Sequence, residues 1–471
     1  MDRLLVSAAH KSSGKTTITL GLCAALTAQG ARVQPFKKGP DYIDPMWLAQ
    51  ASGRPCYNLD PYLMTAAQIR GLFSQQAARA DLSIVEGNKG LYDGLALDGS
   101  NSNAALAQML GLPVLLVIDA RGMTRGIAPL ILGYQAFEKN VRIGGVILNR
   151  LGGSRHEAKL RAVIEHYTDV PVLGAVGEDP ALAVAERHLG LIPSNEYAQA
   201  SEQVRRVGER IAAQVNLEAV RALATSAPTL EAPPPAAVPP ATTDARLRIG
   251  IARDRAFGFY YPDDLEALQA AGAELLPFDT LSDTRLPERL DGLFIGGGFP
   301  ELFMDELQAN AALRAQIAAA IEGGLPAYAE CGGLMYLART LSWQGKTCRM
   351  VGVIPGDVTL HARPVGRGYV HLSASEHMPW PGLRDQQVRG HEFHYSSIAG
   401  LPAGTRYAWR VTRGHGIDGQ ADGIVQGHLL ATYSHLRGVA GSDWPAHFMA
   451  FVRQCRDDVA RVPVPSIAGV N

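Results

Sequence analysis

The chain has 471 residues, of which 47% are hydrophobic and 19% charged, so it is globular and long enough for two cores. Its net charge of −1 gives no general attraction to nucleic acid or to an anionic membrane. The five cysteines are scattered without a C-x-x-C pair, which argues against a zinc ribbon or a disulfide framework. No N-terminal stretch resembles a signal peptide, and apolar runs such as LPVLLVI are far shorter than a membrane span. We expect a cytoplasmic protein that binds neither nucleic acid nor membrane.

The first predicted element is a phosphate-binding loop. An apolar strand at Leu4 to Val6 leads through small residues into a helical pattern of isoleucine and leucine, in LLVSAAHKSSGKTTITLGL. The pattern G-x-x-x-x-G-K-[ST] fits residues 9–16 except at Ala9, which stands where the first glycine belongs. Alanine is compatible with this site if its φ need not be positive. The alternative is a Ser/Gly turn that only caps a helix. The residues predicted to bind nucleotide phosphates are Ser12, Ser13, Gly14, Lys15, Thr16 and Thr17.

Acidic residues follow the next two predicted strands. Asp41 and Asp44 lie in the loop of VQPFKKGPDYIDP, and Glu86 ends the strand of DLSIVEGNKGLYDG. Carboxylates at the carboxyl ends of parallel strands lie on the ligand-binding edge of a doubly wound sheet. Because magnesium bound through phosphates takes one or two protein carboxylates, Asp41 and Glu86 are candidate ligands beside the Thr16 hydroxyl. The alternative for Asp41 and Asp44 is a turn beside prolines.

Asn149 ends the later strand of GGVILN. At this position its amide could read the edge of a nucleobase, although asparagine is also a common turn residue. We therefore assign Asn149 to the nucleotide site as a prediction from position alone.

A proline-rich segment divides the chain. Residues 226–243, SAPTLEAPPPAAVPPATT, contain six prolines and favour an extended, semi-rigid spacer. Apolar strands alternate with helical patterns on both sides, and continuous apolar strands indicate parallel sheets covered on both faces. The sequence therefore predicts two doubly wound α/β domains, at residues 1–225 and 244–471, joined by this linker.

The second domain contains a candidate nucleophile. Cys331 lies between the apolar strand of LPAYAE and the helical pattern that follows Gly332 and Gly333, an arrangement that resembles a nucleophile elbow. The amino end of a helix favours a thiolate, and a histidine can activate the thiol further. The glycines of GLFIGGGF, above all Gly297 and Gly298, are candidates for the backbone N–H groups of an oxyanion hole. For the other four cysteines we expect a structural role.

The base that activates Cys331 could come from the histidines of HEFH or from His435. HEFH (residues 391–394) suggests a metal site, but it lacks the H-E-x-x-H spacing that places two imidazoles on one helical face. His435 follows the strand-like run LLATYS, which places it at a sheet edge, and we predict that it is the base.

Nine motifs in one order resemble the cobyrinic acid a,c-diamide synthase family over nearly the whole chain. They are SSGKTT, KKGPDYIDP, VEGNKGLYDG, ERHLGLIP, ARDRAFGFYYP, GGGFPE, AECGGLMYL, GHEFHYS and YSHLR. The resemblance implies a dethiobiotin-synthetase-like P-loop domain and a class I glutamine amidotransferase-like domain. It implies Cys331 as glutaminase nucleophile and His435 as its base. It also implies that ATP, Mg²⁺ and the acceptor carboxylate are served by Lys15, Thr16, Asp41, Tyr42, Asp44 and Glu86.

The chain departs from the class I pattern at one catalytic position. A full class I triad has a glutamate two residues beyond its histidine, whereas this chain has Arg437 there. Amidotransferases of the cobyrinate type also lack that glutamate. The third group therefore stays open, with Glu392 as one candidate.

The implied activity is amidation of the a and c acetates of cobyrinic or hydrogenobyrinic acid, with glutamine as nitrogen donor and ATP and Mg²⁺ as cofactors. One alternative is the same chemistry on another tetrapyrrole, such as siroheme or nickel-sirohydrochlorin. A second is a partitioning-type ATP switch, whose signature lysine would fall at His10, one place before Lys11. A homodimer is left open.

Overall fold

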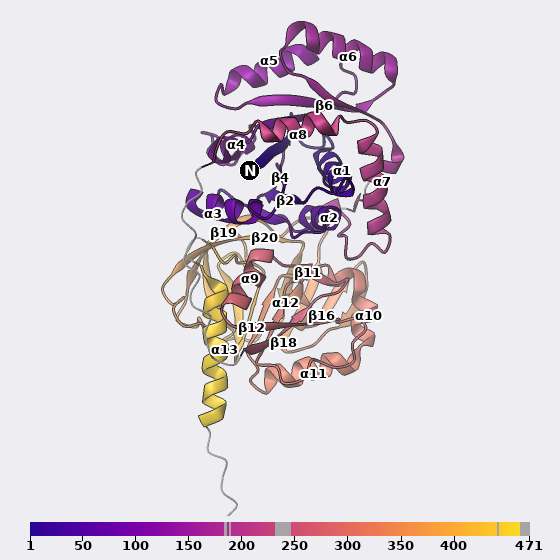
Figure 1. The fold of residues 1–471 in the computed structure, drawn as a ribbon. Coiled ribbons are helices and arrows are strands. Elements are labelled where there is room, and N and C mark those ends of the chain that lie inside the picture. Colours follow the sequence, from indigo (N-terminus) through magenta and orange to yellow (C-terminus); the bar gives the residue numbers. More distant parts are fainter. Residues whose placement is uncertain (183–185, 188–189, 231–245, 440–441, 462–471) are drawn as a thin grey trace, which may run out of the picture. The chain divides into compact units, whose positions relative to one another are not determined.

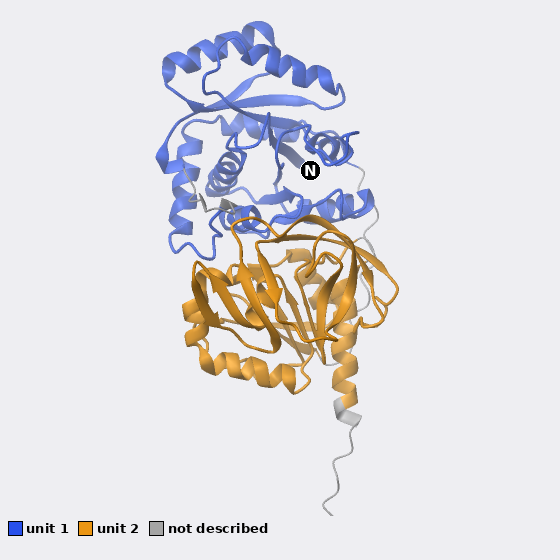
Figure 2. Ribbon diagram, turned by 180° about the vertical axis from the view of Figure 1, so that it is seen from behind, with its two compact units in different colours: residues 1–237 blue, residues 238–471 orange. Residues whose placement is uncertain are grey.

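The computed structural model describes residues 1–182, 186–187, 190–230, 246–439 and 442–461. The chain forms two compact units, residues 1–237 and 238–471, each considered by itself below (Figure 2). This division falls within the range predicted as the linker, of which residues 231–243 lie outside the described part. Within the described ranges, no helix combines the length and apolar character that a membrane crossing requires.

The N-terminal unit is built on a seven-stranded sheet with the order β3-β2-β4-β1-β5-β6-β7. Figure 1 labels β2, β4 and β6 of this sheet. All neighbouring strands are parallel. The strands are β1 (Asp2–Ala8), β2 (Val33–Lys38), β3 (Tyr57–Leu59), β4 (Leu82–Glu86), β5 (Val114–Asp119), β6 (Ile143–Leu151) and β7 (Val172–Gly177). The helices are α1 (Lys15–Ala28), α2 (Ile43–Ser52), α3 (Ala66–Ala77), α4 (Asn103–Leu110), α5 (Ile127–Phe137), α6 (Ser154–Tyr167), α7 (Ala200–Ala212) and α8 (Leu217–Thr225). A 3-10 turn (Pro180–Leu182) and the short pair β8 (Glu186–Arg187) and β9 (Gly190–Leu191) complete the unit.

Helices cover both faces of this sheet because its strands are apolar on both sides. Leu4 and Val6 of β1 belong to the core that packs against α1, α2, α7 and α8. On the opposite face, Phe36 of β2 contacts Phe73 of α3, with ring centroids 4.8 Å apart. The predicted doubly wound α/β fold is confirmed for this unit. Since β1 lies between β4 and β5, the loop after β1 opens where the strand order reverses, which is where such sheets bind ligands.

Helix α1, which follows the phosphate-binding loop, packs against α7 through small residues. A Cβ at Gly208 of α7 would lie 2.8 Å from the Cβ of Ala24. At Gly21 of α1, a Cβ would lie 2.2 Å from Cγ1 of Ile211. The position of α1 therefore depends on two glycines that let the helices approach closely.

We expect Gly208→Leu to lower the free energy of unfolding by about 1–3 kcal/mol, because overpacking forces the two helices apart. The matched control is Gly133→Leu in α5, where an added Cβ meets nothing within 4 Å. That control should be neutral or slightly stabilising, since leucine is the better helix former. Urea titrations followed by circular dichroism measure both variants, and equal midpoints would contradict the packing argument.

The C-terminal unit contains a nine-stranded sheet with the order β12-β10-β13-β15-β24-β23-β22-β19-β20. Five strands are parallel: β12 (Ala273–Phe278), β10 (Leu247–Ala252), β13 (Gly292–Ile295), β15 (Ala327–Glu330) and β24 (Leu429–Thr432). An antiparallel half continues from β24: β23 (Ala421–Gln426), β22 (Arg406–Arg413), β19 (Gly366–Ala374) and β20 (Gln387–His394). The strands β10, β13 and β15 were predicted from LRIGIA, DGLFIGG and LPAYAE, and β24 from the strand-like run LLATYS. Neither β12 nor the antiparallel half was predicted.

Smaller sheets and helices surround this sheet. One sheet has the order β17 (Lys346–Arg349), β16 (Ala338–Trp343), β18 (Ile354–Leu360) and β21 (Ser396–Ala399), and β11 (Phe257–Phe259) pairs with β14 (Gly297–Gly298). The helices are α9 (Pro262–Ala270), α10 (Met304–Ala309), α11 (Ala311–Glu322), α12 (Gly332–Leu337) and α13 (Trp444–Arg461), with a 3-10 turn at Pro300–Phe303. One core contains residues of α10, α11 and α12, and the other contains residues of α9 and α13. Helices thus flank the sheet on both faces, as predicted.

Candidate active sites

The loop between β1 and α1 has the strand, loop, helix order of a phosphate-binding loop. Gly14 precedes α1 with φ 88°, and a Cβ there would lie 2.1 Å from Nδ2 of Asn149. Glycine is therefore required at this position by both conformation and space. Ser12 also has positive φ, 66°, whereas Ala9 is not among the described residues with positive φ. The alanine in place of the first glycine is compatible with the loop for this reason.

Neighbouring strands hold the carbonyl groups of this loop. Asn149 donates from Nδ2 to the Ser13 carbonyl at 2.8 Å. Arg150 donates from Nη1 to the Ser12 carbonyl at 2.8 Å and to Oδ2 of Asp119 at 2.8 Å. These bonds fix the loop shape before a nucleotide arrives. The assignment of Asn149 to a nucleobase stays a prediction, and its amide nitrogen is bonded to the loop.

The predicted acidic residues come together around a lysine that the sequence analysis did not assign. Lys37, at the end of β2, has its Nζ 2.5 Å from Oδ2 of Asp44, 3.0 Å from Oε1 of Glu86 and 3.7 Å from Oδ2 of Asp41. Thr16 donates its hydroxyl to Oε1 of Glu86 at 2.6 Å and to Oδ2 of Asp44 at 3.3 Å. A lysine within a strand buried along its whole length was the available signal, because such a charge needs carboxylate partners.

Burial and mutual charge shift the pKa values of this cluster. Burial alone would lower the pKa of Lys37, but Asp44, Glu86 and Asp41 outweigh it and raise that pKa well above its usual value. Burial, with the charge of Asp44, raises the pKa of Asp41 to about 7. Burial also raises the pKa of Glu86, with Lys37 opposing, and lowers that of Lys15, with Glu86 opposing. A further positive charge near these carboxylates would therefore stabilise their ionised forms.

The donor atoms of this cluster suit a magnesium ion. Oε2 of Glu86 is buried and accepts no hydrogen bond from the described residues. Hydroxyl and carboxylate oxygens are the hard ligands that Mg²⁺ prefers. Across the described ranges, no three or more His, Cys, Asp or Glu side chains are placed to hold a metal ion. Thr16, Asp41 and Glu86 offer oxygen donors of this kind, and their assignment as magnesium ligands stays a prediction.

Asp41 also has the turn role that was its alternative. Its Oδ1 accepts from the backbone N–H groups of Ile43 at 2.9 Å and Asp44 at 3.2 Å, at the start of α2. Its Oδ2 faces Lys37. Tyr42 precedes α2 and is half-buried. Asp44, in the first turn of α2, lies beside the phosphate-binding loop through its contact with Thr16.

Cys331 lies at a sharp turn between β15 and α12. Its backbone has φ 47° and ψ −98°, a conformation that non-glycine residues rarely adopt. A Cβ at Gly332 would lie 2.9 Å from the Gly298 nitrogen, and one at Gly333 would lie 2.1 Å from the Ile295 carbonyl oxygen. The two glycines after Cys331 are therefore required because the neighbouring backbone passes so closely. The arrangement matches the predicted elbow.

The structure brings His435 and the glycine turn to the same sheet edge as Cys331. Strands β15 and β24 are neighbours, and the Cys331 N–H donates to the Thr432 carbonyl at 2.7 Å. His435 follows three residues later. A Cβ at Gly297 would lie 2.6 Å from Cε1 of His435, so this glycine lies directly against the imidazole ring.

The surroundings of the Cys331 thiol oppose the stabilisation of a thiolate that is predicted from the helix amino end, and that stabilisation stays a prediction. Burial raises the pKa of Cys331, and the carboxylates of Glu301 and Glu330 raise it further. Cys331 therefore holds its proton at neutral pH and needs a base to remove it.

The carboxylate beside His435 is Glu330, and the earlier candidate Glu392 was wrong. Oε2 of Glu330 lies 3.3 Å from Nδ1 of His435. Glu392 instead accepts from the N–H groups of His415 at 2.7 Å and Gly416 at 2.8 Å. Sequence reasoning missed Glu330 although it ends a buried strand, the same signal that identified Glu86.

Two more side chains surround His435. The ring of His391 stacks on it, with centroids 4.9 Å apart and planes inclined by 16°. Arg437, at the position of the class I glutamate, instead pairs with Asp263 at 2.7 Å and lies 4.5 Å from the ring centroid of Tyr261. Arg437 thus belongs to a separate buried ion pair.

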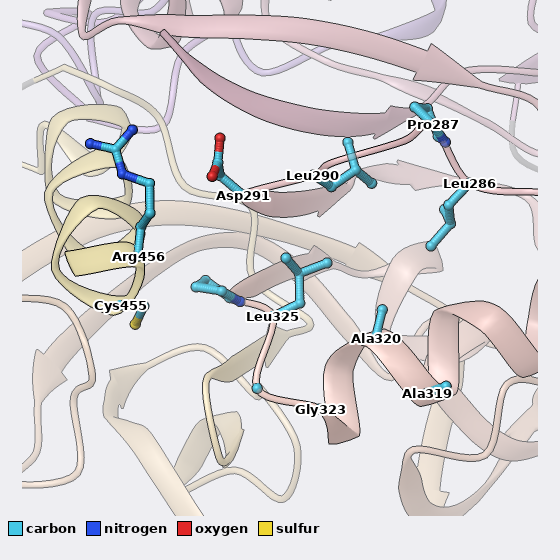
Figure 3. Close-up of a pocket in the computed structure, with 12 residues that line it drawn as sticks. Leu286, Pro287, Leu290, Asp291, Ala319, Ala320, Gly323, Leu325, Cys455 and Arg456 are labelled. Carbon is cyan, nitrogen blue, oxygen red and sulfur yellow. The ribbon is translucent and has the colours of Figure 1, made fainter. Parts of the chain in front are cut away.

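A cavity of about 500 Å³ lies at the other end of the C-terminal sheet. Figure 3 shows Leu286, Leu290 and Leu325 on its apolar side, with Asp291 and Arg456 at the charged side. Asp291 precedes β13, whereas Cys331 follows the carboxyl end of β15. The cavity therefore lies apart from the nucleophile. All five cysteines of the chain are buried and free of disulfide bonds.

Two family models match the chain, one in each unit. Residues 2–186 match an AAA domain, and residues 248–440 match the CobB/CobQ-like glutamine amidotransferase domain. The first model indicates nucleotide binding by the N-terminal unit. The second indicates a glutamine amidotransferase fold in the C-terminal unit.

Curated relatives match over nearly the whole chain. The cobyrinate a,c-diamide synthase of Magnetococcus marinus is 45% identical over 96% of this chain and 98% of its own length. The Methanosarcina acetivorans protein of the same name is 42% identical, over 93% of each chain. That of Synechocystis is 38% identical, over 92% of this chain and 90% of its own. A solved putative GMP synthase subunit from Thermoplasma acidophilum, 18% identical, covers 46% of this chain and 99% of its own with a TM-score of 0.35. The fold assignment rests on the two family models.

Proposed function

The chain belongs to the cobyrinate a,c-diamide synthase family, and from this premise we propose that it amidates the a and c acetate groups of cobyrinic acid. It is a glutamine-dependent amide ligase with a nucleotide-binding unit. The observation that carries the proposal is the end-to-end match to relatives of this name, which spans both candidate sites. We assign the synthase reaction to residues 1–225 and the glutaminase reaction to residues 244–471.

The glutaminase reaction starts at Cys331. His435 takes the thiol proton as the sulfur attacks the side-chain amide carbon of glutamine. The N–H groups of Gly297 and Gly298 stabilise the oxyanion of the tetrahedral intermediate. Protonation of the amide nitrogen then releases ammonia and leaves a thioester, which water hydrolyses to glutamate. The close contact between Gly297 and His435 supports this assignment.

The synthase reaction activates the acceptor carboxylate, because a carboxylate does not condense with ammonia at neutral pH. An acceptor carboxylate oxygen attacks the γ-phosphorus of ATP, and ADP leaves. Lys15 and the loop amides of residues 12–17 stabilise the charge on the transferring phosphoryl group. Ammonia then attacks the acyl phosphate carbon, and phosphate leaves with formation of the amide.

We assign the magnesium ligands to Thr16, Asp41 and Glu86. When bound, the ion supplies positive charge to the β- and γ-phosphate oxygens. The hydrogen bond from Thr16 to Glu86 and the buried Oε2 of Glu86 support this set. Lys37 holds the three carboxylates together by its charge. Tyr42 and Asp44, at the start of α2, face the acceptor in this proposal, and Asn149 contacts the nucleotide.

The choice of tetrapyrrole is tested directly by mass spectrometry. Cobyrinic acid, siroheme and nickel-sirohydrochlorin are each incubated with the enzyme, ATP, magnesium and glutamine. We expect two successive amidations of cobyrinic acid and none of the other two. Amidation of only another tetrapyrrole would overturn the substrate assignment and keep the chemistry. Absence of all amidation and of glutamate release would favour the partitioning-type switch. A homodimer stays a prediction.

Cys331→Ser should abolish glutamine-supported amidation while leaving amidation with high free ammonia unchanged, because ammonia bypasses the thioester. Product formation is measured with both nitrogen sources. Cys455→Ser, at a buried cysteine that lines the distant cavity, is the matched control and should keep both activities. Equal loss with both nitrogen sources in Cys331→Ser would contradict the nucleophile assignment.

Lys15→Ala should reduce amidation with either nitrogen source on the order of 10³-fold, because it removes charge that stabilises phosphoryl transfer. Lys11→Ala, at an exposed lysine of the same loop, should keep the original rate. The measurement is initial-rate ADP release together with amide formation. Ammonia-dependent synthesis at the original rate in Lys15→Ala would show that activation takes place elsewhere.

Glu86→Gln should reduce amidation steeply and raise the magnesium concentration needed for half-maximal rate, because shape is kept and charge is lost. Nucleotide affinity, measured by calorimetry at several magnesium concentrations, should weaken less than the rate. Asp60→Asn is the control, since this buried carboxylate follows β3 and accepts from the Tyr62 N–H at 2.8 Å. Unchanged magnesium dependence with normal turnover would make Glu86 a structural residue.

A further inference from the structure

We propose that Glu330 is the positioning residue of the glutaminase site, which holds His435 in the tautomer that can accept the Cys331 proton. This inference rests on the glutaminase function proposed above. It assigns the third member of the site to the residue that directly precedes the nucleophile. The position where a class I enzyme has its glutamate is Arg437 in this chain.

The first argument is the contact between the two side chains. Oε2 of Glu330 lies 3.3 Å from Nδ1 of His435, and each side chain is 4% exposed. A carboxylate at this distance accepts the Nδ1 proton, which leaves Nε2 of the neutral ring as the proton acceptor. Because water is largely excluded, the charge of Glu330 acts on the imidazole more strongly than it would at the surface.

The second argument is that Glu330 is itself held in place. Its Oε1 accepts from the Tyr328 hydroxyl at 2.6 Å and from the Leu436 N–H at 2.9 Å. Leu436 directly follows His435, so one carboxylate fixes both the ring and the adjacent backbone. Burial and the charge of Glu330 raise the pKa of Tyr328 well above its usual value, so the phenol remains a donor.

The third argument is the strand register. Glu330 ends β15 opposite Thr432, which ends β24, and the Cys331 N–H donates to the Thr432 carbonyl at 2.7 Å. Nucleophile and carboxylate are consecutive residues of one strand end, and the base lies just beyond the end of the adjacent strand. The sheet itself therefore sets their separation. When His435 takes the thiol proton, the new imidazolium lies beside a fixed negative charge.

A structural role for Glu330 is the competing explanation, since it anchors the backbone at Leu436. Glu330→Gln separates the two because its amide oxygen still accepts from Tyr328 and Leu436, whereas its charge is lost. We expect the kcat of glutamine hydrolysis to fall about 10²- to 10⁴-fold, by analogy with orienting carboxylates of other triads. The KM for glutamine should change less than threefold. Ammonia-dependent amidation by the same preparation should be unchanged.

The conservative variant and a matched control complete the test. Glu330→Asp keeps the charge on a shorter side chain. Its kcat for glutamine hydrolysis should be at least tenfold higher than that of Glu330→Gln. Glu392→Gln removes a buried carboxylate beside His394 rather than His435, and it should leave glutamine hydrolysis within threefold of the unchanged enzyme. Circular dichroism of all variants reports on folding.

Three outcomes would overturn the proposal. Glutamine hydrolysis within threefold of normal in Glu330→Gln would show that the carboxylate charge is not needed. Equal loss of glutamine- and ammonia-dependent activity would assign a structural role. A rise in KM with unchanged kcat would place Glu330 in substrate binding. If the unchanged enzyme released no glutamate from glutamine, the proposed glutaminase function would fail instead, so the two failures are distinguishable.

Discussion

A carboxylate buried at the end of a parallel strand is the constraint on which both candidate sites depend. Glu86 ends β4 and Glu330 ends β15, and both are almost completely buried. An ionised carboxylate in such a place costs several kcal/mol unless charges or donors surround it. Glu86 obtains Thr16 and Lys37, and Glu330 obtains the donors of β15 and of the residues that follow β24. Each carboxylate therefore fixes the side chains and backbone of the strand ends around it.

Both candidate sites also require neighbouring chain segments to pass very close to the backbone beside the reactive residues. This explains why a glycine precedes Lys15 and why glycines follow Cys331. Gly14 adjoins Lys15, and its missing Cβ is the space that Asn149 occupies. Gly333 adjoins the turn at Cys331, and its missing Cβ is the space beside the Ile295 carbonyl. In each case a strand ends, the chain turns sharply, and a helix starts at the ligand-binding edge. The glycines thus position a lysine in one unit and a thiol in the other.

Much of this architecture was predictable because it follows from local patterns. Apolar strands that lead to Glu86 or Cys331, and glycines placed before helices, each predict a sheet edge that binds a ligand. The antiparallel strands β19, β20, β22 and β23 were missed because their pairing is made between residues far apart in sequence, and their alternating polar residues resemble loops. Lys37 and Glu330 were missed for a related reason. Their roles depend on which strands are neighbours, and the strand order cannot be read from a single strand.

Sequence distance also explains the one incorrect partner. Glu392 was one open candidate for the third group, but in β20 it accepts from the backbone of His415 and Gly416. Glu330 lies more than one hundred residues before His435 and becomes its neighbour only because β15 pairs with β24. Arg437 occupies the position of the class I glutamate. Because a buried cation needs an anionic partner, Arg437 pairs with Asp263 instead of with His435.

The electrostatics of the glutaminase site favour a resting state with little charge separation. Because burial and two carboxylates raise the pKa of Cys331, its thiol stays protonated, and a preformed thiolate would place a second anion beside Glu330. Two like charges in a buried site are costly, and the cost is removed only when the thiolate charge moves onto the substrate oxygen. In the proposed reaction the neighbours of that oxygen are the N–H groups of Gly297 and Gly298 rather than the carboxylates. If Cys331 and His435 act as proposed, proton transfer to His435 and attack on the substrate are therefore favoured together. The charges that disfavour a free thiolate then limit the reactivity of Cys331 before a substrate is bound.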